Sequence, residues 1–143
     1  MFFNKEKVQN ENENFIKITA LLIHAAKIDE NYSDQEQDII KKALIKIGVT
    51  QENIEKIIKN AEKIEENSNQ ILEFTKEVKN MTEENKIKIV ETLWEIIYSN
   101  KKADVYETSL MRRLCGLLYI DSKIMGDIKE KIKKKTYNDL LGK

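Results

Sequence analysis

Residues 15–47 decide the fold, and they read FIKITALLIHAAKIDENYSDQEQDIIKKALIKI. Apolar residues fill most positions up to residue 28, which is typical of a helix that other helices surround. A polar loop follows at residues 29–32, and Ser33 with Glu36 three positions later is the capping-box pattern that begins a helix. Apolar residues then recur at helical spacing up to Ile47. The stretch therefore predicts a helical hairpin at the centre of the molecule.

The rest of the sequence has the composition of an all-α protein. The 143 residues include no proline and four glycines, and Ile, Leu, Lys and Glu recur at helical spacing. Helix starts and stops are marked by Gly48, Thr50, Thr82, Asp104 and Asp121. We predict a compact all-α bundle of six or seven helices in one domain over residues 14–143. Residues 1–13 are polar and are expected to form a flexible arm, with the first helix beginning near Asn14.

Charge, cysteine content and apolar runs exclude several classes of protein. Lys and Arg together number 25, as do Asp and Glu, so no net charge draws the protein to nucleic acid. The single cysteine, Cys115, excludes an internal disulfide. The apolar run at residues 18–28 is shorter than the roughly 20 residues of a membrane span, and the apolar start at residues 1–3 is too short for a secretion signal. These features predict a cytoplasmic protein.

The first hairpin has a counterpart later in the chain. A shift of 71 positions places Asp29 on Asn100 and Glu36 on Glu107. Apolar positions match in the same register, with Leu22 on Leu93, Ala26 on Ile97 and Ala43 on Leu114. Two such hairpins can pack about a pseudo-twofold axis, which would bring their loops together. We therefore predict two pseudo-symmetric hairpins whose acids face a common site.

Two short motifs in these hairpins also occur in a known family. They are Ala25-Ala26-Lys27-Ile28-Asp29 leading to Glu36, and Ser99-Asn100 leading to Glu107 and then Leu110-Met111-Arg112-Arg113-Leu114. With Glu73-Phe74-Thr75 they resemble the TerB-like family, over residues 15–125. That family includes tellurite-resistance TerB proteins and the N-terminal domain of a membrane-anchored DnaJ-like co-chaperone. The resemblance implies an all-helical domain whose repeated acids hold a divalent cation, with a role in tellurite or metal stress.

The cation site implied by this resemblance has four ligands: Asp29, Glu36, Asn100 and Glu107. Their hard oxygen atoms suit Ca²⁺, Mg²⁺ or Mn²⁺. The sequence departs from the family pattern, because Glu30 and Lys101 stand where a glycine follows each loop acid. Asn100 offers a carbonyl oxygen without a charge. In the alternative interpretation, Glu36 and Glu107 only cap helices, which would explain both acids without a metal.

No catalytic arrangement is visible in the sequence. His24, the one histidine, lies among apolar residues on a core helix, so we expect a packed, hydrogen-bonded residue and not a ligand or base, and no second histidine can complete a zinc site. Cys115 is expected to act as a small apolar residue. We therefore predict a non-enzymatic binding or adaptor module whose partner is another protein. Without a metal, such a module would be co-chaperone-like.

A basic segment near the C-terminus is a second candidate contact surface. Residues 129–135 contain five lysines and one glutamate next to apolar residues. An amphipathic helix could touch an acidic partner or an anionic membrane through Lys131, Lys133, Lys134 and Lys135. A solvated helix end, where positive charge is favourable, is the simpler explanation.

Overall fold

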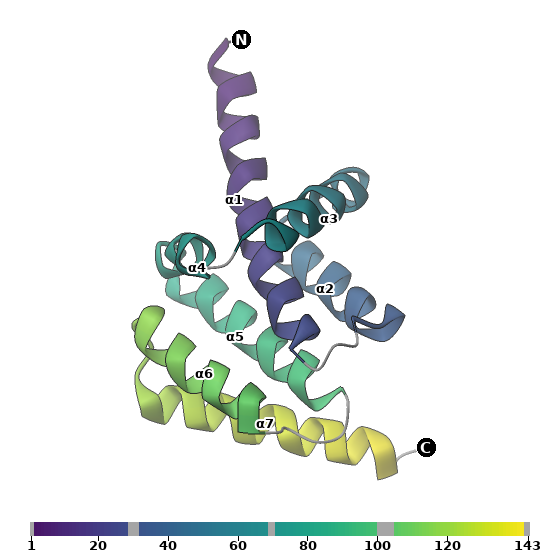
Figure 1. The fold of residues 1–143 in the computed structure, drawn as a ribbon, viewed down its shortest axis with the longest axis vertical. Helices are drawn as coiled ribbons and strands as arrows, with labels where there is room; N and C mark the ends of the chain where they lie inside the picture. Colours follow the sequence, from purple (N-terminus) through teal and green to yellow (C-terminus); the bar gives the residue numbers. More distant parts are fainter. Residues whose placement is uncertain (1, 29–31, 69–70, 100–104, 142–143) are drawn as a thin grey trace.

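The computed structural model describes residues 2–28, 32–68, 71–99 and 105–141, with side chains from residue 12 onward except those of residues 105–107 and 140. These residues form seven helices and no strand, which confirms the predicted all-α bundle (Figure 1). The helices are α1 (Phe2–Lys27), α2 (Asp34–Lys46), α3 (Gln51–Glu66), α4 (Leu72–Lys79), α5 (Glu83–Tyr98), α6 (Val105–Leu117) and α7 (Ser122–Leu141). Among the described helices, none combines the length and the apolar character needed to cross a membrane.

The second half of α1 passes through the centre of the bundle. α2, α3, α4 and α5 all pack against it (Figure 1). Its side chains between residues 18 and 26 are buried, apart from that of His24. Leu21, Leu22 and Ile23 are completely buried although they point in different directions around the helix. This is the surrounded helix that the run of apolar residues predicts.

α1 is longer than the sequence predicted. We expected a start near Asn14, but the helix begins at Phe2. Its first half extends away from the other helices (Figure 1). Residues 2–13 contain no glycine or proline, and their Lys, Glu and Gln favour a helix. The predicted boundary was therefore wrong, whereas the flexibility of residues 1–13 stays a prediction.

α5 is the second central helix. Its residues Ile89, Val90, Leu93 and Ile97 are completely buried, and α5 contacts both α1 and α2. Its most extensive contact is with α7, where Trp94 Nε1 donates to Met125 Sδ at 3.3 Å. α6 packs against α4. The two central helices thus touch each other as the two-hairpin hypothesis requires, while the pseudo-symmetry itself stays a prediction.

Most helix ends follow the signals in the sequence. Gly48 has a left-handed φ of 107°, and the predicted caps Thr82 and Asp121 each accept a hydrogen bond from the backbone of the helix that follows. Thr50 differs, because its side chain accepts no bond from the α3 backbone and instead accepts the Asn53 side-chain amide at 3.0 Å. Thr50 therefore occupies the predicted N-cap position of α3, but its side chain makes no capping bond to the helix backbone. Asp104 lies outside the described residues.

Candidate functional site

Glu36 lies in the first turn of α2 and is only 1% exposed. The N–H and the hydroxyl of Ser33 both donate to Glu36 Oε1 at 3.0 Å, and Ser33 Oγ accepts the Glu36 N–H at 3.2 Å. These bonds complete the predicted capping box. A buried carboxylate needs such donors, because removing its charge from water is costly. The capping role predicted for Glu36 is therefore confirmed.

Tyr32 immediately precedes this capping box and adds a buried hydroxyl to the same region. Among the described residues, no group forms a hydrogen bond with the Tyr32 hydroxyl. Burial, followed by the carboxylates of Glu62 in α3 and of Glu36, raises the pKa of Tyr32 above its ordinary value of 10.0. The carboxylates of α2 and α3 thus act electrostatically on the tyrosine hydroxyl that precedes α2. A buried hydroxyl without a partner is uncommon in proteins and calls for a physical explanation.

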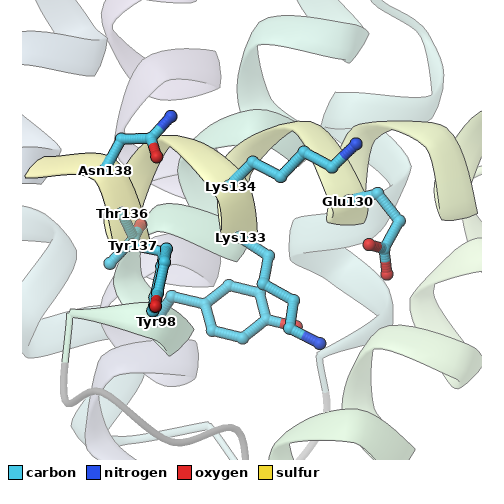
Figure 2. A pocket seen from close by; sticks show the side chains of 7 residues that line it. All are labelled: Tyr98, Glu130, Lys133, Lys134, Thr136, Tyr137 and Asn138. Carbon is cyan, nitrogen blue, oxygen red and sulfur yellow. The ribbon is translucent and has the colours of Figure 1, made fainter.

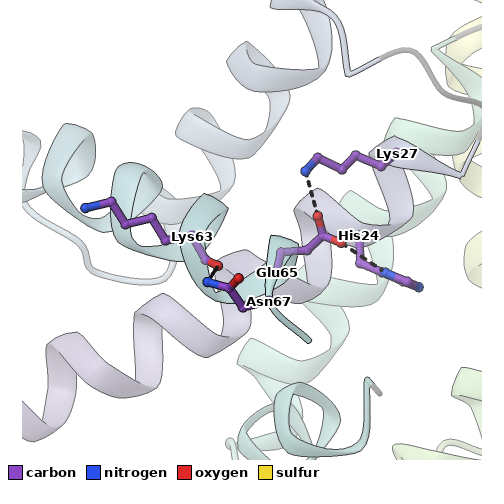
Figure 3. A network of polar contacts seen from close by, with 5 residues as sticks. All are labelled: His24, Lys27, Lys63, Glu65 and Asn67. Carbon is purple, nitrogen blue, oxygen red and sulfur yellow. Dashed lines mark hydrogen bonds and ion pairs between the residues drawn. The ribbon is translucent and has the colours of Figure 1, made fainter. Parts of the chain in front are cut away.

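Glu65 brings a second acid of α3 to the end of α1 (Figure 3). Its carboxylate is 11% exposed and lies 2.7 Å from Lys27 Nζ and 3.5 Å from His24 Nδ1. The His24 side chain is 35% exposed, so it is only partly packed, and Glu65 is its polar partner. It faces α3 at the edge of the bundle, where the carboxylate offers a polar partner. Asn67 ends α3 beside this network by donating to the Lys63 carbonyl at 2.9 Å.

Of the four predicted ligands, the structure describes the side chain of Glu36. Asp29 and Asn100 lie outside the described residues, and the side chain of Glu107 in α6 is likewise not described. Within the described part of the chain, no group of three or more His, Cys, Asp and Glu side chains is arranged to hold a metal ion. The Glu36 carboxylate and the Tyr32 hydroxyl are hard oxygen donors that fit Ca²⁺, Mg²⁺ or Mn²⁺, but they are only part of the roughly six ligands these ions take. The paired cation site therefore stays a prediction.

Sequence reasoning missed Tyr32, Glu62 and Glu65 as members of this region. Glu62 and Glu65 lie three residues apart on a helix that is otherwise rich in charge, and nothing in their spacing distinguishes them from solvent-facing acids. The contact of α3 with α1 brings them to the first hairpin. A tyrosine inside an otherwise polar loop was the one local signal available.

The four lysines predicted as a contact surface are all exposed on α7. Lys131 Nζ lies 3.4 Å from Glu91 Oε2 on α5, whereas Lys133 and Lys134 line a cavity (Figure 2). Lys135 is also exposed. Lys131, Lys134 and Lys135 lie three and four positions apart and therefore share one face of α7, which a membrane or an acidic partner could meet. Contact through Lys131, Lys133, Lys134 and Lys135 stays a prediction.

The cavity beside α7 has a volume of about 380 Å³. Tyr98 at the end of α5 and Tyr137 of α7 lie next to each other on one side of the helix, with Glu130 farther along (Figure 2). Burial and then the Glu130 carboxylate raise the pKa of Tyr98. The described residues that line the cavity include a carboxylate, two ammonium groups and three hydroxyl groups, which can bind a polar ligand.

These features define the class of the protein. It is an all-α bundle built around a central helix, with a polar loop and a buried capping acid. Residues 15–130 match the family described as tellurite resistance protein TerB. The chain therefore belongs to the TerB family, as its two hairpin motifs predicted. No curated protein and no solved structure matches the chain.

Proposed function

We propose that this TerB-family domain is a non-enzymatic binding module that holds a divalent cation at the loop of its first hairpin. The observation that carries the proposal is the buried Tyr32 hydroxyl, which has no hydrogen-bond partner among the described residues and lies under the influence of Glu36 and Glu62. A cation, or a water molecule bound to one, would satisfy this oxygen and offset the negative charge around it. The family description supports a role in tellurite or metal stress.

The proposed site uses Asp29, Glu36 and the Tyr32 hydroxyl from the first hairpin. If the second hairpin is related to the first by pseudo-symmetry, Asn100 and Glu107 complete the set. When bound, the cation supplies positive charge that ties the loop to α2. The loop would then present one conformation to a partner protein, and the partner's affinity would depend on the cation.

Thermal unfolding with added Ca²⁺, Mg²⁺ or Mn²⁺ tests this proposal. A ligand at 100 times its Kd stabilises the folded state by about 2.7 kcal/mol, which corresponds to a rise in Tm of roughly 5–10 °C for a domain of this size. Glu36→Gln keeps an oxygen that can accept the Ser33 bonds but removes the charge. We expect this variant to melt close to the unmutated protein without ions and to lose the ion-dependent rise.

Glu52→Gln is the matched control, because Glu52 is an exposed acid in the first turn of α3. It should keep the full ion-dependent rise in Tm. Two results would reject the cation: no rise in the unmutated protein at millimolar concentrations of all three ions, or an equal rise in Glu36→Gln.

The complete capping box of Ser33 and Glu36 favours a second function, a protein-interaction module of the co-chaperone-like kind in which the acids serve only as caps. In that case the melting curve of the unmutated protein is the same with EDTA and with divalent ions. A full-strength response to ions in the unmutated protein, lost in Glu36→Gln, would exclude this alternative.

A further inference from the structure

A groove of about 210 Å³ lies between α4 and the C-terminal end of α6. These two helices pack against each other on the side of the bundle away from α2 and α3 (Figure 1). The residues that matter for its properties are Leu72, Lys76 and Lys79 of α4, and Gly116, Leu117 and Tyr119 at the end of α6. None of them belongs to the loop of the first hairpin, so the groove is independent of the proposed cation.

Gly116 and Tyr119 are unusual residues for their positions at the end of α6. Glycine would be more favourable at 119, and a larger residue would be more favourable at 116. Gly116 lies within α6, where glycine weakens a helix, yet a Cβ atom built there would meet nothing within 4 Å. Tyr119 has a left-handed φ of 55° directly after the helix, in the position that normally takes glycine. No packing contact inside the described chain therefore requires glycine at 116. The arrangement leaves the floor of the groove open and projects an aromatic ring at its end.

The groove also exposes two large apolar side chains. Tyr119 is 72% exposed and Leu72 is 48% exposed. The Lys79 ammonium group lies 4.3 Å from the centre of the Tyr119 ring, a cation–π contact that holds the ring over α4. Scattered apolar side chains on a surface are ordinary, but these two flank a single groove. Together they form an apolar surface with a fixed aromatic wall.

The charge of the groove indicates the chemistry of its partner. Lys76 and Lys79 line it, and no acid is among its described lining residues. Arg112 and Arg113 are exposed on α6 one turn before Gly116. The volume of about 210 Å³ is below the roughly 300–1,000 Å³ of typical small-molecule sites and suits one large side chain. The complementary ligand is thus an acidic chain segment with an apolar anchor.

We propose that this groove docks an acidic segment of a partner protein. One apolar side chain of the segment sits over Gly116, between Leu72 and Tyr119, and flanking carboxylates meet Lys76 and Lys79. Such an arrangement places a buried apolar anchor at the centre and charges at the rim, as in protein–protein interfaces.

A displayed library of random 12-residue peptides, selected on the unmutated full chain in EDTA, tests the proposal. We expect the enriched peptides to combine an aromatic or aliphatic anchor with a net negative charge. Their binding should perturb the amide NMR signals of residues 72–79 and 116–119. Tyr119→Gly should weaken binding at least tenfold while leaving the Tm unchanged or higher, which separates loss of the site from loss of the fold.

Charge reversal provides the second arm of the test. Lys76→Glu with Lys79→Glu should also weaken binding at least tenfold, and the effect of salt on binding should decrease. Lys56→Glu with Lys59→Glu on α3 is the matched control, since both lysines are exposed and the change in net charge is identical. This control should bind the selected peptides as the unmutated protein does.

Several results would overturn the docking groove. These are enrichment of neutral or basic peptides, unchanged binding by Tyr119→Gly, and NMR changes confined to other surfaces. Two further results would assign the groove to another occupant and reject the proposal. The first is self-association through Tyr119. The second is pelleting with phosphatidylglycerol vesicles that depends on Lys76 and Lys79, without any peptide binding. The peptide selection is done in EDTA, so its result does not depend on whether the proposed cation site exists. The melting test with divalent ions likewise does not depend on whether the groove binds a peptide.

Discussion

Replacing Glu36 by alanine is the most informative single change to the folded domain. Glu36 Oε1 accepts two hydrogen bonds from Ser33, both at 3.0 Å, in a setting where the glutamate is 1% exposed. Glu36→Ala removes the acceptor and leaves the Ser33 N–H without its partner at the start of α2. It also opens a small buried space beside the helix.

The size of the effect follows from these contacts. A hydrogen bond to a charged group contributes about 1.5–3 kcal/mol, and the two bonds share one oxygen, so they do not add in full. We expect Glu36→Ala to lower the free energy of unfolding by about 2–3 kcal/mol. This is a large part of the roughly 5–15 kcal/mol of a typical domain and would lower Tm by roughly 4–11 °C. Glu36→Gln keeps an acceptor oxygen and should cost about 1 kcal/mol or less.

Urea unfolding followed by circular dichroism measures these differences. Thr50→Ala is the control, because Thr50 stands at the N-cap of α3 without a side-chain bond to the helix backbone and should cost less than about 0.5 kcal/mol. A cost below about 0.5 kcal/mol for Glu36→Ala would refute the capping argument. Equal costs for Glu36→Gln and Glu36→Ala would show that the charge, and not the accepted bonds, stabilises the helix start.

Three further predictions concern stability and surface contacts. Gly116→Ala should raise the free energy of unfolding by up to about 1 kcal/mol in urea titrations, since a Cβ there meets no neighbour; a loss of stability would contradict this. The raised pKa of Tyr32 means that this residue ionises first in the unfolded chain, so its contribution to stability should be constant well below pH 10.0 and be lost as the pH rises above it. Tyr32→Phe should lose less stability between pH 8 and pH 10.5 than the unmutated protein. An equal loss in the two proteins would contradict the assignment of the alkaline loss to Tyr32. If α7 touches anionic lipid, the unmutated protein should pellet with phosphatidylglycerol vesicles at low salt, whereas the double variant Lys133→Glu with Lys134→Glu should stay in solution. Failure of the unmutated protein to pellet would remove this alternative.

The parts of the fold that were predictable depend on local signals. Helical spacing and capping residues act within a few positions, and they placed the start of α2 at Ser33 and the left-handed turn at Gly48 correctly. The start of α1 was missed because residues 2–13 are mostly polar and show no apolar periodicity that would reveal a helix.

The candidate site was predictable only in part, because its members come from separate helices. Ser33 and Glu36 interact within one turn, so their sequence pattern sufficed. The approach of Glu62 to Tyr32 depends on how α3 packs against the first hairpin, which no local pattern encodes. His24 illustrates the same limit, since its apolar neighbours in sequence suggested the core, whereas Glu65 of α3 gives it a polar partner at the edge.

Crystals grown with millimolar Mn²⁺ and measured for anomalous scattering test the proposed cation most directly. The account predicts an anomalous peak within about 2.6 Å of a Glu36 carboxylate oxygen, at the loop between α1 and α2. No peak there at a saturating ion concentration would contradict the cation and leave the acid as a helix cap.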